Sequence, residues 1–149
     1  MDFRIGLNII SGHPNSGATS TIVNLVNLES NTKKVLFLSL ETGFNSLIEK
    51  YHLSGNDSIT LIDKVTSINE LDEELSNNKY DVVYIDYLML LKTENDLYEE
   101  KVKELIDLSN KHNITIVASD LLSENESTDK YKEETFKDVA TIQSLDMIL

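Results

Sequence analysis

The chain has 149 residues, enough for one domain with a hydrophobic core, and it contains no cysteine, which excludes disulfides and thiolate metal sites. Acidic residues number 26 against 13 lysines and arginines, a net charge of −13, which disfavours direct binding of nucleic acid by this chain and suits a basic protein partner or a merely solubilising surface. No apolar run is long enough to span a membrane and no secretory signal opens the sequence, so we expect a cytoplasmic protein.

Short apolar runs alternate with longer amphipathic segments along the chain, and this alternation predicts an α/β fold with a parallel sheet wrapped by helices. Apolar runs predict strands at residues 7–11, 34–40, 58–62, 81–91, 114–119 and 145–149. Apolar residues at helical spacing predict helices at residues 20–30, 44–53, 67–75 and 96–113. In the third of these helices, Ser67 and Glu70 have the spacing of a capping box.

Residues 124–137 are polar and charged and show no apolar period. We predict a flexible loop over residues 123–135, which is either a mobile loop on a functional face or a disordered insertion. The sequence contains no internal repeat and no linker. We therefore predict a single domain over residues 1–149.

The stretch GHPNSGATS lies between a predicted strand and a predicted helix and resembles a phosphate-binding loop. Such a loop has the pattern Gly, four residues, Gly, Lys, Ser or Thr, and its main-chain amides hold an anion. Gly12, Gly17 and Thr19 match this pattern, whereas Ala18 stands where the lysine is expected. The candidate nucleotide-binding residues are Gly12, Pro14, Asn15, Ser16, Gly17, Ala18, Thr19 and Ser20. His13 could donate to a phosphate, but histidine is mostly neutral at pH 7.

The order of motifs resembles the RecA-like ATPase core, most of all the bacterial replicative helicase branch, the DnaB type. The resemblance runs from about residue 6 to the C-terminus and is carried by GLNIISGHPNSGATS, VLFLSLETG, LIDKVTSINEL, YDVVYIDYLMLL and ITIVASDLLS. It implies a three-layer α/β/α sandwich with a mostly parallel central sheet.

The resemblance also implies roles for three residues. Asp86 matches the aspartate that orders the magnesium shell, and Thr19 matches the hydroxyl that binds the same ion. Glu41 matches the glutamate that activates the attacking water. An acid at a strand end is common on its own, so the joint order and spacing of these residues carry the interpretation. We treat Glu41 and Asp86 as vestigial catalytic residues.

Three catalytic parts of the resembled family are missing. Ala18 replaces the lysine, and losing one preorganised donor of this kind costs on the order of 100- to 1000-fold in turnover. Asp120 stands where the family has a glutamine that senses the terminal phosphate, and we expect its carboxylate to face and repel a phosphate. Arg4 is the only arginine, so no arginine finger is expected, nor is the primase-binding domain of the family.

Three hypotheses follow. The first is a catalytically degenerate domain that acts by binding a helicase- or recombinase-type ATPase as a loader, regulator or inhibitor in DNA replication. It requires no cofactor and would bind ATP or ADP with magnesium weakly. The alternatives are a weak ATP-dependent switch and a structural protein that assembles with itself. A composition rich in asparagine, lysine and isoleucine suggests a phage or mobile element of a low-GC bacterium.

Overall fold

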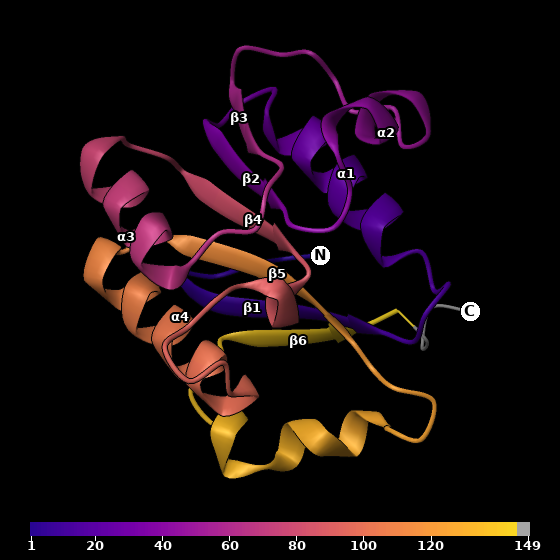
Figure 1. Cartoon of the computed structure of the whole chain (residues 1–149), viewed down its shortest axis with the longest axis vertical. Helices are drawn as coiled ribbons and strands as arrows, with labels where there is room; N and C mark the ends of the chain where they lie inside the picture. Colours follow the sequence, from indigo (N-terminus) through magenta and orange to yellow (C-terminus); the bar gives the residue numbers. More distant parts are fainter. Residues whose placement is uncertain (146–149) are drawn as a thin grey trace.

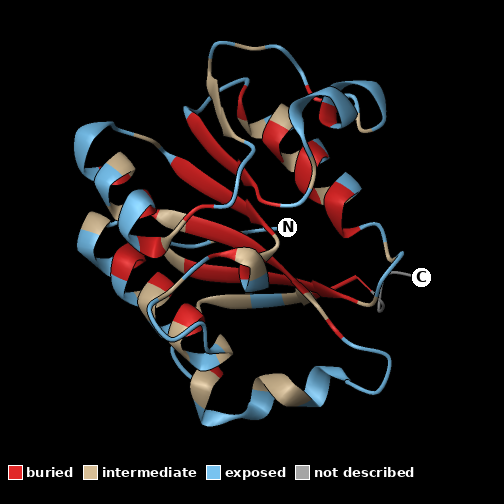
Figure 2. Ribbon diagram, in the orientation of Figure 1, coloured by how far each residue is buried: buried red, intermediate tan, exposed pale blue. Residues whose placement is uncertain are grey.

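The computed structural model describes residues 1–145, and its centre is a six-stranded sheet in the order β3-β2-β4-β5-β1-β6 (Figure 1). Every pair of neighbouring strands is parallel. The strands are β1 (Gly6–Gly12), β2 (Val35–Ser39), β3 (Ile59–Ile62), β4 (Val82–Asp86), β5 (Thr115–Leu121) and β6 (Thr141–Ser144). The central strands β2 and β4 are buried along their whole length, as expected for a parallel sheet covered on both faces (Figure 2).

Helices cover both faces of this sheet and form two separate hydrophobic clusters with it. On one face lie α1 (Ala18–Glu29) and α2 (Phe44–Glu49), and on the other lie α3 (Ile68–Asn77) and α4 (Tyr98–His112) (Figure 1). Three short 3-10 helices complete the structure: η1 (Leu88–Leu90), η2 (Thr128–Lys132) and η3 (Glu134–Phe136). This arrangement confirms the predicted three-layer α/β/α sandwich. None of the helices within residues 1–145 has the length and apolar character needed to cross a membrane.

The capping box predicted at Ser67 is present, since the Ser67 hydroxyl accepts a hydrogen bond from the amide of Glu70 at 3.1 Å. Asn113 ends α4 in the left-handed conformation that asparagine tolerates better than most residues. Acidic residues occupy the first turn of α4 and basic ones the last, which complements the helix dipole. Local sequence thus sets the ends of both helices on this face.

Three predicted elements differ from the structure. The strand expected over residues 81–91 ends at Asp86, because the chain turns into η1, where the Leu90 amide donates to the Tyr87 carbonyl. The helix expected over residues 44–53 ends at Glu49. The last strand is β6 at residues 141–144, and residues 146–149 of the strand predicted at 145–149 lie outside the described part of the chain.

The polar segment predicted as a flexible loop contains η2 and η3, which pack against the sheet layer that carries α4. Phe136 is buried there, and its ring contacts those of Tyr131 and Tyr98 at centroid distances of 4.9 and 6.0 Å. The sequence indicated neither 3-10 helix, because a single buried aromatic residue produces no apolar period. The flexibility of residues 123–135 stays a prediction.

Candidate functional site

The candidate phosphate-binding loop joins the carboxyl end of β1 to α1. Gly17 precedes α1 with φ of 87°, in the left-handed region that favours glycine. The first helical hydrogen bond runs from the Thr21 amide to the Gly17 carbonyl, so the amides of residues 18–20 have no acceptor within the helix. No side chain caps this end and no acidic residue lies in the first turn, which leaves the positive end of the helix dipole open to an anion.

A hollow of about 130 Å³ lies over this loop. It is lined by His13, residues 15–20, Tyr51, Tyr87 and Leu121. Ligand pockets typically hold about 300–1,000 Å³, so this hollow matches a phosphate group better than a whole nucleotide. Most of the predicted loop residues therefore converge on one hollow of phosphate size.

Two predicted loop residues do not line the hollow. Gly12 lies beneath it, and a side chain at this position would collide with Ser16, which explains why glycine is needed. Pro14 is exposed to solvent. Ala18, at the position of the expected lysine, is only 4% exposed and packs into the hydrophobic cluster under α1.

Thr19 and Asp86, the predicted magnesium ligands, are in direct contact although 67 residues separate them in the chain. The Thr19 hydroxyl donates to one carboxylate oxygen of Asp86 at 2.9 Å, and Ser119 donates to the other at 2.6 Å. Asp86 is fully buried, and this burial raises its pKa although the two hydroxyl donors act in the opposite direction. The hydroxyl of Tyr87 lies 3.0 Å from that of Thr19.

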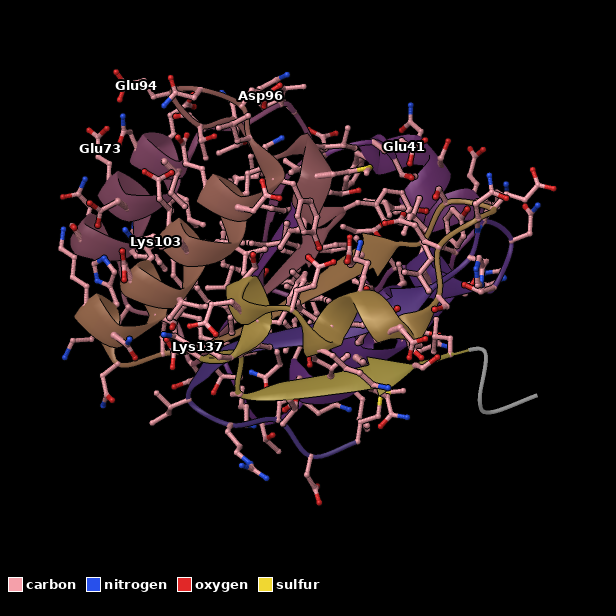
Figure 3. The ribbon with its side chains drawn as sticks, turned by 90° about the horizontal axis from the view of Figure 1, so that it is seen from below. Glu41, Glu73, Glu94, Asp96, Lys103 and Lys137 are labelled. Atoms are coloured by element: carbon pink, nitrogen blue, oxygen red, sulfur yellow. The ribbon has the colours of Figure 1, made fainter. Side chains whose placement is uncertain are left out.

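Glu41 follows β2 at the same edge of the sheet and is exposed. Its negative charge contributes to the raised pKa of Asp86, and the adjacent Leu40 amide donates to the Asp86 carbonyl at 2.8 Å. Figure 3 shows Glu41 at the opposite end of the molecule from Glu73 and Glu94. The position is compatible with the predicted water-activating role, which stays a prediction.

The loop meets some of the needs of a magnesium nucleotide and fails one. An uncapped helix terminus, a phosphate-sized hollow and two oxygen ligands in Thr19 and Asp86 fit a phosphate and its magnesium ion. The charge of the lining does not fit phosphoryl transfer, because no lysine or arginine side chain within residues 1–145 borders the hollow. The site therefore fits phosphate binding by main chain better than it fits catalysis.

Other cations of the chain lie elsewhere. Lys33 pairs with Glu29 at the far end of α1, and Arg4 precedes β1 at the opposite end of that strand. His13 does lie in the loop, where its Nε2 is 2.9 Å from the main-chain carbonyl oxygen of Glu126. That ring nitrogen is therefore directed at the segment before η2.

The prediction that Asp120 faces a bound phosphate is wrong. Asp120 is in register with Ser11 of β1, and it contacts residues of α4 and η2 on the face of the sheet away from α1. Leu121, the next residue, is the one that lines the hollow. Successive side chains of a strand point to opposite faces, so a difference of one position at the end of β5 decides which residue meets the loop.

Asp120 instead belongs to a buried cluster that sequence reasoning missed. Its Oδ2 atom accepts hydrogen bonds from the Tyr98 and Tyr131 hydroxyls, both at 2.6 Å, and lies 3.1 Å from the Lys130 ammonium. Burial, followed by the charge of Asp120, raises the pKa of both tyrosines. The only signal in the sequence was the pair Lys130 and Tyr131 within an otherwise featureless polar segment.

No protein-family model and no curated protein sequence matches the chain. Among solved structures, the ATPase domain of a DnaB-like helicase matches with a TM-score of 0.63 and 16% identity over 93% of this chain. A DnaB-like replicative helicase, studied with its interactions with primase, matches with a TM-score of 0.65 and 18% identity over 92% of this chain. The chain spans 66% and 44% of the lengths of these two proteins. The fold is thus the RecA-like fold of DnaB-type ATPase domains.

Proposed function

We propose that the chain is a catalytically degenerate RecA-like domain that acts by binding another protein, a helicase- or recombinase-type ATPase. The observation that carries this proposal is the lining of the phosphate-loop hollow, where Ala18 is buried and no cationic side chain within residues 1–145 replaces the missing lysine. Phosphoryl transfer needs positive charge on the outer phosphates, so a loop without it is expected to turn over poorly.

The proposed action through a protein partner rests on charge and on the fold. A net charge of −13 repels nucleic acid and attracts a basic protein surface. In the DnaB type, which the sequence resembles, motor subunits bind each other through the face that carries the nucleotide site. A degenerate copy of such a domain has the shape to dock on that face of a true ring and to act as a loader, regulator or inhibitor during DNA replication. The absence of cysteine is compatible with a reducing cytoplasm, where we place this role.

In this proposal the loop keeps a binding role at most. The amides of the first turn of α1 would hold a phosphate, while Thr19 and Asp86 would hold its magnesium ion. Glu41 would lie near the outer phosphate, but no group compensates the charge that develops during transfer. A bound nucleotide would therefore persist rather than be hydrolysed.

Two measurements test the proposal together. Magnesium-dependent ATP hydrolysis is measured for the wild type and for Glu41→Gln, and both are expected at background. Complex formation with a purified hexameric helicase is measured by size-exclusion chromatography with light scattering, and a stable complex is expected. Turnover that disappears in Glu41→Gln would contradict the loss of catalysis, and the absence of any complex would contradict the partner.

A weak nucleotide switch is the second candidate, and the Thr19–Asp86 hydrogen bond favours it, since this pair retains the geometry that a magnesium ion needs. Calorimetry with ATP and magnesium decides between the two. A dissociation constant below about 1 mM, or roughly 4 kcal/mol of binding free energy, supports the switch. Self-assembly of the chain alone in the light-scattering experiment would support the third hypothesis, an assembly protein.

A further inference from the structure

A second hollow, of about 290 Å³, lies on the face of the sheet opposite α1, between the start of α4 and the 3-10 helices η2 and η3. Its aromatic walls are Tyr98 and Phe136, and its charged lining consists of Glu99, Glu126, Glu133 and Lys130. This hollow is more than twice the volume of the one over the phosphate loop. Neither the fold nor the proposed nucleotide chemistry uses it.

The lining has a surplus of negative charge. Three carboxylates face a single ammonium group, that of Lys130. Lys130 is already engaged, because its Nζ lies 3.1 Å from buried Asp120 and 3.5 Å from Glu126. Glu99 and Glu133 are exposed and form no ion pair with any residue in the described part of the chain. Their charges are available to a cation from outside.

The aromatic walls suit a cation as well. The Lys130 ammonium lies 4.6 Å from the centroid of the Tyr98 ring, within the range of a cation–π interaction. The wall of the hollow therefore already holds one ammonium group of the chain itself. Behind it, the Oδ1 atom of Asp120 is buried and has no hydrogen-bond partner, which adds uncompensated negative potential at the base of the hollow.

From this geometry we propose that the second hollow receives an arginine or lysine side chain of the protein partner. The inference rests on the proposed function, in which the chain works by binding a protein. An extended basic side chain would lay its apolar stem against Tyr98 and Phe136 and its charged end between Glu99 and Glu133. The electrostatic match is the one that the overall charge of the chain calls for, here confined to one concave site.

Nuclear magnetic resonance with a small probe tests the site without knowledge of the partner. The isotope-labelled protein is titrated with N-acetyl-arginine amide, and N-acetyl-glutamine amide serves as the neutral control. Amide shifts are expected around Tyr98, Lys130 and Phe136 with the arginine probe only. The double variant Glu99→Gln/Glu133→Gln is expected to weaken binding about fivefold, because two exposed ion pairs each contribute roughly 0.5 kcal/mol.

The matched control is Glu73→Gln/Glu94→Gln, which removes two exposed charges at the side of the molecule where α3 lies (Figure 3). Equal weakening in both double variants, or arginine-dependent shifts away from the hollow, would overturn the proposal. The same variants are then assayed for the helicase complex. A complex that forms but ignores Glu99→Gln/Glu133→Gln refutes this docking site alone, whereas the absence of any complex refutes the proposed function and leaves the probe result standing.

Discussion

Replacing Lys130 by methionine tests whether Asp120 is a structural charge held beneath η2. Methionine keeps the length and the apolar character of the lysine stem, so the substitution removes little besides the ammonium group. Asp120 is fully buried and the Lys130 side chain is only 16% exposed, which places the pair among buried ion pairs. The unfolded chain solvates both groups, so the loss of the pair is felt in the folded state.

The cost of this substitution can be bounded from the structure. Removing one partner of a buried ion pair typically costs about 3–5 kcal/mol, because the other charge is left uncompensated. The hydroxyls of Tyr98 and Tyr131 still donate to Asp120, so we expect the low end, about 3 kcal/mol. Asp120→Asn in the Lys130→Met background removes the orphaned charge, and the double-mutant cycle should give a coupling energy of about 2 kcal/mol.

Urea unfolding followed by circular dichroism measures these free energies at neutral pH. Lys132→Met is the matched control two residues away, because Lys132 is 83% exposed and pairs only with exposed Asp129. We expect this control to change the unfolding free energy by less than about 0.5 kcal/mol. If the effects of Lys130→Met and Asp120→Asn add to within about 0.5 kcal/mol, the two groups do not interact and the placement of Asp120 is refuted.

Three further outcomes are expected. Ala18→Lys should tighten the binding of ATP with magnesium about tenfold in calorimetry, the effect of one charge-assisted hydrogen bond, while Ala18→Met should not; no gain would mean that more than the cation is missing. Wild-type stability should fall relative to Asp86→Asn as pH rises above 3.8, since burial raises the pKa of Asp86 and the folded state holds this proton more tightly than the unfolded state; urea midpoints that keep a constant difference across pH would contradict this. Ser67→Ala should cost about 1 kcal/mol and lower Tm by about 3 °C in a thermal melt, and an unchanged Tm would show that the cap contributes nothing.

The sequence by itself determined the layers of the fold and the place of the phosphate loop. Apolar runs of strand length and amphipathic helices depend on residues that are close in the chain, and so does the glycine pattern that begins at Gly12. The contact between Thr19 and Asp86 also followed from sequence, because the carboxyl ends of parallel strands meet at one edge of the sheet.

Only the tertiary structure decided which way Asp120 points and what neutralises it. The side chains at the end of β5 alternate between two chemically different faces, and the apolar run of that strand is buried on both, so its pattern carries no information about parity. The partners of Asp120 come from α4 and from η2, and the second hollow exists only where these elements pack together. Buried charge and concave surface depend on groups brought together from distant parts of the chain, which no local pattern of residues can encode.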